Sequence, residues 1–223
     1  AIEGRLDTYG VVLQSASALL SEPGFVDLDR FRTFVATLDL PARYPGLAGI
    51  GYVARVRGEQ RHALEARMHA AGVPGFAIRP EGERPEYLPV VALEPLDERS
   101  TAALGLDLGA EPHLRVAMQR ARDSGLLAAS DGASKDGRAD VVEGFVVFQP
   151  VFLSGAMPDG ANARRTDLAG YVFSPFDTAE FVATSVQQPD DRQVGFDISD
   201  AEVGRTLYRW QPTEDGAEPA SPT

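Results

Sequence analysis

The fold is decided by the stretch YPGLAGIGYVARV, residues 44–56. A Tyr-Pro-Gly turn opens this stretch, and its residues then alternate between two sides, with Ile50 and Tyr52 on one and Gly51 on the other. Alternation with a period of two predicts a β-strand over residues 47–56. Because glycine has no side chain, the glycines predict that another segment or a small molecule lies unusually close to this strand.

The composition is that of an ordinary globular protein. The 223 residues are 43% hydrophobic and 24% charged, which suits one large domain or two small ones. With 33 acidic and 21 basic residues, the chain has a formal net charge of −12. Such a chain is a poor partner for nucleic acid or for an anionic lipid surface, because both require basic patches.

Cysteine is absent, which excludes thiol nucleophiles, disulfides and thiolate metal sites. No stretch approaches the ~20 apolar residues of a membrane span, and no signal peptide is visible. The chain begins inside a helical pattern and ends in TEDGAEPASPT, so we expect it to be a segment of a longer protein. Residues 2–5 read IEGR, which matches a common protease-site scar, so we draw nothing from residues 1–5.

Two helices are predicted ahead of the opening strand. In the first, apolar residues recur every three or four positions, at Leu6, Tyr9, Leu13, Ala16 and Leu20. This spacing forms a heptad-like seam, as in helices that pair in a coiled coil. The second helix begins after Asp27, a suitable N-cap, and ends before the Tyr-Pro-Gly turn.

Short strands alternate with helices after residue 56. Apolar periodicity and turn residues predict helices over 58–71, 112–124 and 177–187. The same signals predict strands at Phe76–Ile78 and over 86–94, 126–130, 142–152 and 167–176, and a final hairpin from VGFDIS (194–199) and TLYRW (206–210). Pro89 implies an edge position or a bulge in its strand. This order of elements favours an α+β fold in which helices cover antiparallel sheets.

No arrangement of side chains predicts catalysis, a metal site or a cofactor. Neither a G-x-S-x-G elbow nor a Ser-x-x-Lys pair occurs, and GLAGIG (46–51) has the wrong glycine order for a dinucleotide fingerprint. His62 and His69 lie seven residues apart on a charged helix, which indicates a solvated face rather than a metal pair. Aromatic and small residues on short strands are typical of a small-ligand cavity, or simply of a packed core.

Five segments together indicate a family. They are YPGLAGIGYVARV (44–56), RPEYLPVVALEPLD (84–97), RARDSG (120–125), EGFVVFQPVF (143–152) and AGYVFSPFD (169–177). In this order and spacing they resemble the CHASE domain, the extracytoplasmic sensor of receptor histidine kinases and nucleotide cyclases. The resemblance covers nearly all of residues 6–210.

The resemblance implies a long N-terminal stalk helix followed by two PAS-like modules with antiparallel sheets. We expect a helical stalk over residues 1–43, a membrane-distal ligand-binding module over 44–152, a membrane-proximal module over 153–211 and a flexible tail over 212–223. The resemblance also implies transmembrane helices on both sides of the chain, a periplasmic location, and an output histidine kinase or diguanylate cyclase domain outside it.

The resemblance also indicates where a ligand binds. In the plant members, which are cytokinin receptors, a key aspartate precedes the pair that reads Glu86-Tyr87 here. This chain has Pro85 at that position, and because proline offers no carboxylate, we do not expect cytokinin binding of the plant type. Ser130 aligns with a polar threonine of the family and keeps a hydroxyl at that position.

Strand parity completes the predicted site. If residue 85 faces a cavity, Tyr87, Pro89 and Val91 share its side. Residues from the opening strand and from the strand over 142–152 would form the remaining wall. The predicted ligand-binding residues are Tyr52, Pro85, Tyr87, Val91, Ser130, Phe145 and Val147.

Three hypotheses for the function follow. The leading one is a non-catalytic sensor domain that binds an unknown small molecule and transmits the signal through the stalk, in a receptor that forms a homodimer through its N-terminal helix. The second is a ligand-free module for dimerisation or protein interaction, which predicts a filled core near Tyr87. The third is an unrecognised hydrolase, which predicts clustered carboxylates with perturbed pKa values in a cleft.

Overall fold

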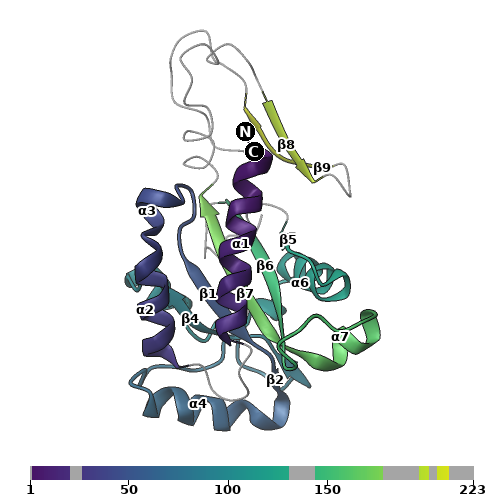
Figure 1. The fold of residues 1–223 in the computed structure, drawn as a ribbon. Coiled ribbons are helices and arrows are strands. Elements are labelled where there is room, and N and C mark those ends of the chain that lie inside the picture. Colours follow the sequence, from purple (N-terminus) through teal and green to yellow (C-terminus); the bar gives the residue numbers. More distant parts are fainter. Residues whose placement is uncertain (1, 21–26, 131–143, 178–195, 201–204, 211–223) are drawn as a thin grey trace.

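The computed structural model describes residues 2–20, 27–130, 144–177, 196–200 and 205–210. Its main strands are β1 (Ile50–Ala54), β4 (Val90–Glu94), β5 (Ala128–Ala129), β6 (Gly144–Phe152) and β7 (Leu168–Asp177). These form one antiparallel sheet in the order β4-β1-β7-β6-β5 (Figure 1). The predicted α+β class, with helices over an antiparallel sheet, is therefore confirmed.

The long strands β6 and β7 form the middle of the sheet, because both are rich in aromatic and β-branched residues. They pair from Gly144 opposite Asp177 to Phe152 opposite Leu168. β1 pairs with the other side of β7. The sheet thus extends past residue 152, where the two modules were expected to divide, and the pair of PAS-like modules stays a prediction.

Gly51 explains why the opening strand carries so much bare backbone. It lies opposite Phe173 of β7, and a Cβ added to Gly51 would collide with the Phe173 ring. The glycine is therefore required by an aromatic side chain of the neighbouring strand. The sequence predicted that either another segment or a small molecule lies close to this strand. At Gly51 the structure shows another segment, β7.

The predicted strand over 86–94 is divided at Pro89. Its first part, β3 (Glu86–Tyr87), pairs with β2 (Val56–Arg57) in a separate two-stranded sheet. Its second part, β4, is an edge strand whose pairing with β1 shifts register between Tyr52 and Val53. The edge position and the irregularity expected from Pro89 are both confirmed.

Helices cover both faces of the sheet (Figure 1). The core of the first face contains residues of α1 (Ile2–Leu20), α2 (Leu28–Leu38) and α4 (Arg61–Ala70), and that of the second face residues of α5 (Glu98–Ala103) and α6 (Pro112–Ser124). Alternation along β1 directs Ile50 and Tyr52 into the first core and Val53 into the second. The remaining helices are α3 (Leu40–Arg43), η1 (Gly58–Gln60), η2 (Leu108–Ala110) and α7 (Ala161–Asp167).

The ends of two predicted helices are confirmed by their capping residues. Asp27 caps α2, since its carboxylate accepts a hydrogen bond from the Arg30 N–H at 3.0 Å. Pro112 opens α6 and Gly125, with a φ of 76°, ends it in the left-handed conformation.

Other elements differ from the prediction. The prediction of a strand at Phe76–Ile78 is wrong, because the backbone there belongs to no strand. The side chains of Phe76 and Ile78 are nevertheless buried. The short helices α5 and α7 were not predicted. The final hairpin is confirmed as β8 (Phe196–Asp200) and β9 (Arg205–Trp210). The predicted helix over 177–187 and the tail over 212–223 lie outside the described residues, apart from residue 177.

Helix α1 lies along the first face of the sheet (Figure 1). Tyr9, Leu13 and Ala16 are buried there, and the Tyr9 hydroxyl donates to the Pro45 carbonyl at 2.9 Å. The Tyr9 ring also contacts Phe176 of β7, with ring centroids 5.6 Å apart. Tyr9, Leu13 and Ala16 of the heptad-like seam therefore pack on the sheet of their own chain, and the helical stalk over residues 1–43 stays a prediction.

Replacement of Leu13 tests this packing. Leu13→Ala should lower the free energy of unfolding by about 2–5 kcal/mol, because a fully buried side chain would leave a cavity beneath α1. Val11→Ala, on the exposed side of the same helix, should change it by less than about 0.5 kcal/mol. Urea denaturation measures both values. Equally small effects of the two substitutions would contradict the packing of α1 on the sheet.

Candidate functional site

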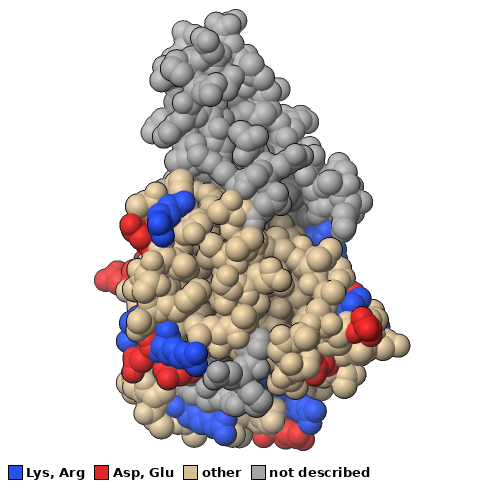
Figure 2. Space-filling model, in the orientation of Figure 1, with Lys and Arg blue, Asp and Glu red and all other residues tan. Residues whose placement is uncertain are grey.

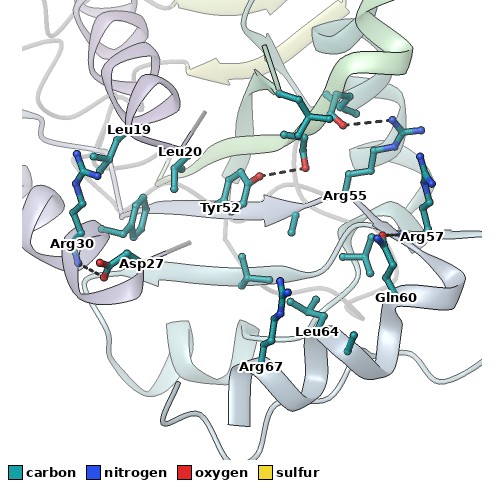
Figure 3. Close-up of a pocket in the computed structure, with 18 of the residues that line it drawn as sticks. Leu19, Leu20, Asp27, Arg30, Tyr52, Arg55, Arg57, Gln60, Leu64 and Arg67 are labelled. Carbon is teal, nitrogen blue, oxygen red and sulfur yellow. Dashed lines mark hydrogen bonds between the residues drawn. The ribbon is translucent and has the colours of Figure 1, made fainter. Parts of the chain in front are cut away.

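A cavity of about 540 Å³ lies between the sheet and the helices of its first face. Figure 3 shows its walls, which come from the end of α1, the start of α2, the strands β1 and β2, and α4. Small-molecule sites in proteins typically have volumes of about 300–1,000 Å³. This cavity is therefore the candidate functional site.

The floor of the cavity is apolar. It contains the buried side chains of Phe31, Tyr52, Leu64 and Val91. The Tyr52 hydroxyl donates to the Ala169 carbonyl at 3.3 Å. Burial raises the pKa of Tyr52 far above its ordinary value, so this hydroxyl stays neutral and remains a donor.

Polar side chains surround this floor and form the rim of the cavity. The rim contains Arg30, Arg55, Arg57, Gln60 and Arg67, together with Asp27. The residues come from α2, from the end of β1 and its continuation into β2 and η1, and from α4. The site thus combines an apolar floor with a rim rich in guanidinium groups.

Helix α4 is held in place by Glu65, which faces away from the cavity. One carboxylate oxygen of Glu65 accepts hydrogen bonds from Arg61 Nε and from the Ile78 N–H, both at 3.1 Å. The Arg61 guanidinium also lies over the Tyr87 ring, 5.7 Å from its centroid. These contacts join α4 to two other segments of the chain and so fix the face that α4 presents to the cavity.

Two of the seven predicted site residues, Tyr52 and Val91, line the cavity. Phe145 and Val147 are buried on the same face of the sheet, in the core that α1 covers. There the Phe145 ring stacks on Phe176 with centroids 4.9 Å apart. These two residues therefore pack beneath α1 and do not line the cavity.

The other three predicted residues have positions away from the cavity. Tyr87 is buried, and its hydroxyl donates to the Gly82 carbonyl at 2.7 Å. The Ser130 hydroxyl accepts a hydrogen bond from the Val146 N–H at 2.9 Å and so links the end of β5 to β6. Pro85 is exposed and does not line this cavity, so a role of residue 85 in ligand binding stays a prediction.

The arginines of the rim were missed by the sequence reasoning. The segment over 58–71 was interpreted as a charged helix with a solvated face. Gln60, Leu64 and Arg67 are spaced four and three residues apart, which places them on one helical face. This spacing shows that the three residues share one side of the helix. It does not show whether that side meets water or lines a cavity.

Among the described residues, the two carboxyl groups with a shifted pKa lie outside the cavity. The guanidinium groups of Arg165 and Arg122 hold the pKa of Asp123 well below its usual range, and this carboxylate joins α6 to α7. The pKa of Glu65 is also lowered. The carboxylate cluster that the hydrolase hypothesis predicts is thus not found among the described residues of the cavity.

Within the described ranges, no group of three His, Asp or Glu side chains is arranged to hold a metal ion. None of the helices in those ranges has the length and apolar character to cross a bilayer.

Acid titration tests the role of Glu65. Burial alone would raise the pKa of Glu65, but hydrogen bonds from Ile78, Arg61 and His62 outweigh it and lower the pKa. A carboxyl whose pKa is lowered by folding stabilises the fold above its unfolded pKa of about 4.3 and loses this effect as the pH falls. Glu65→Gln should therefore lower the free energy of unfolding by about 1 kcal/mol at neutral pH and by less at a pH of about 3.5.

Urea denaturation of both proteins at the two pH values measures this difference. Glu59→Gln, a change at an exposed glutamate just before α4, is the matched control. A Glu65→Gln effect of the same size at both pH values would contradict the role assigned to the ionised carboxylate.

Comparison with known proteins identifies the family. The family model for the CHASE domain matches residues 24–208, a range that contains the whole five-stranded sheet and most of the cavity lining. A search of curated proteins finds no significant match. The resemblance seen in the five sequence segments is confirmed, and the chain belongs to the CHASE domain family, whose members are extracytoplasmic sensor domains of signalling receptors and not enzymes.

Proposed function

We propose that this chain is the ligand-sensing domain of a transmembrane histidine kinase or diguanylate cyclase, and that it binds a small molecule in the cavity on the first face of the sheet. The observation that carries the proposal is the cavity itself, whose volume of about 540 Å³ suits a small molecule. Membership of the CHASE family supports a sensing role. In this proposal, transmembrane helices flank the chain and the domain is periplasmic.

Helix α1 offers a route for the signal. Leu19 and Leu20, at its C-terminal end, line the cavity, whereas Tyr9 and Leu13 pack on the sheet. The helix has 19 residues and therefore spans about 28 Å. An occupant of the cavity would touch one end of this rigid element. It could shift the position of α1 only by binding more tightly to one position than to the other.

The proposal includes a homodimer through the N-terminal helix. The side of α1 that faces away from the sheet exposes only uncharged residues among those whose side chains are described, namely Thr8, Val11, Gln14, Ser15 and Ala18. Figure 2 shows a broad tan area without Lys, Arg, Asp or Glu over the middle of this face. Such a surface supports packing against a second copy, because no charge would have to be removed from water.

Blocking the cavity tests the proposed function. Ala63 and Ala66 are both exposed on α4, but only Ala63 lines the cavity. A ligand found by screening a metabolite panel should raise the melting temperature of the native protein by several degrees at saturating concentration. It should have no effect on Ala63→Trp, whose indole would fill the cavity, and should stabilise Ala66→Trp as it stabilises the native protein.

Thermal shift assays followed by calorimetry provide the measurement. A ligand that stabilises Ala63→Trp as strongly as the control would place the binding site outside the cavity. If no ligand stabilises the native protein but its melting temperature rises with protein concentration, the result would favour the ligand-free dimerisation module instead.

A further inference from the structure

The cavity has a charge opposite in sign to that of the whole chain. Acidic residues outnumber basic ones by 33 to 21 in the sequence. The described lining of the cavity instead contains four arginines and a single carboxylate, that of Asp27. A concave site with an apolar floor and an excess of one sign of charge at its rim attracts ions of the opposite sign. The electrostatics of this cavity therefore favour an anion.

Part of the rim is already engaged within the protein. Arg55 Nε donates to the Glu86 carboxylate at 2.5 Å, and another nitrogen of Arg55 donates to the Arg165 carbonyl at 2.9 Å. The carboxylate of Asp27 accepts the Arg30 N–H as the cap of α2. Neither Glu86 nor Asp27 forms an ion pair with the other arginines of the rim in the described part of the chain.

Arg57 and Arg67 are both exposed, and within the described residues neither guanidinium has a carboxylate at ion-pair distance. Figure 3 shows that Arg67 extends from α4 toward the strands, whereas Arg57 comes from β2 and extends away from α4, on the side of Arg55. The planar guanidinium group matches the geometry of carboxylate and phosphate oxygens.

The floor of the cavity requires an apolar partner. Tyr52, Leu64 and Val91 are buried and line it, and the Tyr52 hydroxyl already donates to the Ala169 carbonyl. Polar groups of a ligand would therefore find their partners at the rim and its apolar part would cover the floor. A molecule with one acidic end and an apolar body satisfies both regions.

We infer that the cavity binds a small organic oxyanion, whose carboxylate or phosphate group is held by Arg67 at the rim and whose apolar body lies on Tyr52 and Val91. This inference rests on the proposed function, because it names the class of ligand for the same cavity. The two acid groups share the chemistry that the rim recognises, and the experiment distinguishes between them.

A series of naphthalene compounds of similar size but different charge tests the inference. The acids are 1-naphthoate and 1-naphthyl phosphate, the neutral compound is 1-naphthamide, the cation is 1-naphthylmethylamine, and inorganic phosphate is the acid without an apolar body. Calorimetry with the native chain should give at least about tenfold tighter binding of one acid than of the amide or the amine. The acid that binds more tightly identifies the preferred oxyanion.

Substitutions at the rim supply the second readout. Arg67→Gln should weaken binding of the preferred acid by about tenfold, because it removes a charge-assisted hydrogen bond from an exposed side chain. Arg57→Gln should weaken binding by less, because it removes a charge of the rim and no direct hydrogen bond to the acid. Arg43→Gln, at an exposed arginine outside the cavity, should leave the affinity unchanged. Ala63→Trp should abolish binding of the acid.

Each other result has a defined meaning. Equal affinities for acid, amide and amine, all lost in Ala63→Trp, would overturn the anion class but keep the cavity as the ligand site. Absence of binding by both acids at millimolar concentration would overturn the inference as well. Inorganic phosphate that binds as tightly as 1-naphthyl phosphate would exclude the contact with the apolar floor. Binding of the whole series that survives in Ala63→Trp would contradict the proposed function itself.

Discussion

The burial of one side of α1 on the sheet is the interaction on which the rest of the structure depends. Leu13 and Ala16 are fully buried there, and Ala16 is small enough to let the helix lie close to the strands. The helix covers the part of the first face that contains Phe145 and Phe176. It ends at Leu20, and the cavity begins where α1 ends. The packing of α1 on the sheet thus places Leu19 and Leu20 in the wall of the cavity that also contains Tyr52.

In the proposed function, the same packing would give the domain a means of responding to a ligand. Helix α1 packs on the sheet through Tyr9 and Leu13 and lines the cavity through Leu19 and Leu20. It would therefore contact both the sheet and any occupant of the cavity. Packed interfaces of this kind change between discrete arrangements more readily than they deform. Arg67 at the rim could add an electrostatic contact from α4, so an anion bound there could also contact Leu19 and Leu20 of α1.

Local signals in the sequence were sufficient to locate most helices and strands, but they were insufficient to identify the residues that line the cavity. Alternation identified the strands, and Asp27, Pro112 and Gly125 fixed helix ends, because these effects act within a few residues. Strand parity showed correctly that Phe145 shares a face with Tyr52, but parity does not say which element covers that face, and α1 covers Phe145.

Two further differences have the same origin. Parity from Pro85 assumed one continuous strand, whereas the stretch is divided at Pro89 between two sheets. Arg67 was not singled out, because a charged helix face looks the same in sequence whether it meets water or a cavity. The heptad-like seam was likewise ambiguous, since its periodicity defines an apolar side and leaves open whether a sheet or a second helix packs on it.

Amide hydrogen exchange followed by mass spectrometry tests the central claim most directly, because it measures whether α1 is part of the core. If α1 packs on the sheet as described, peptides from residues 9–18 should exchange nearly as slowly as peptides from β6 and β7, since all would open only when the core opens. Exchange of the α1 peptides at the rate of an unprotected chain, while β6 and β7 stay protected, would contradict the account.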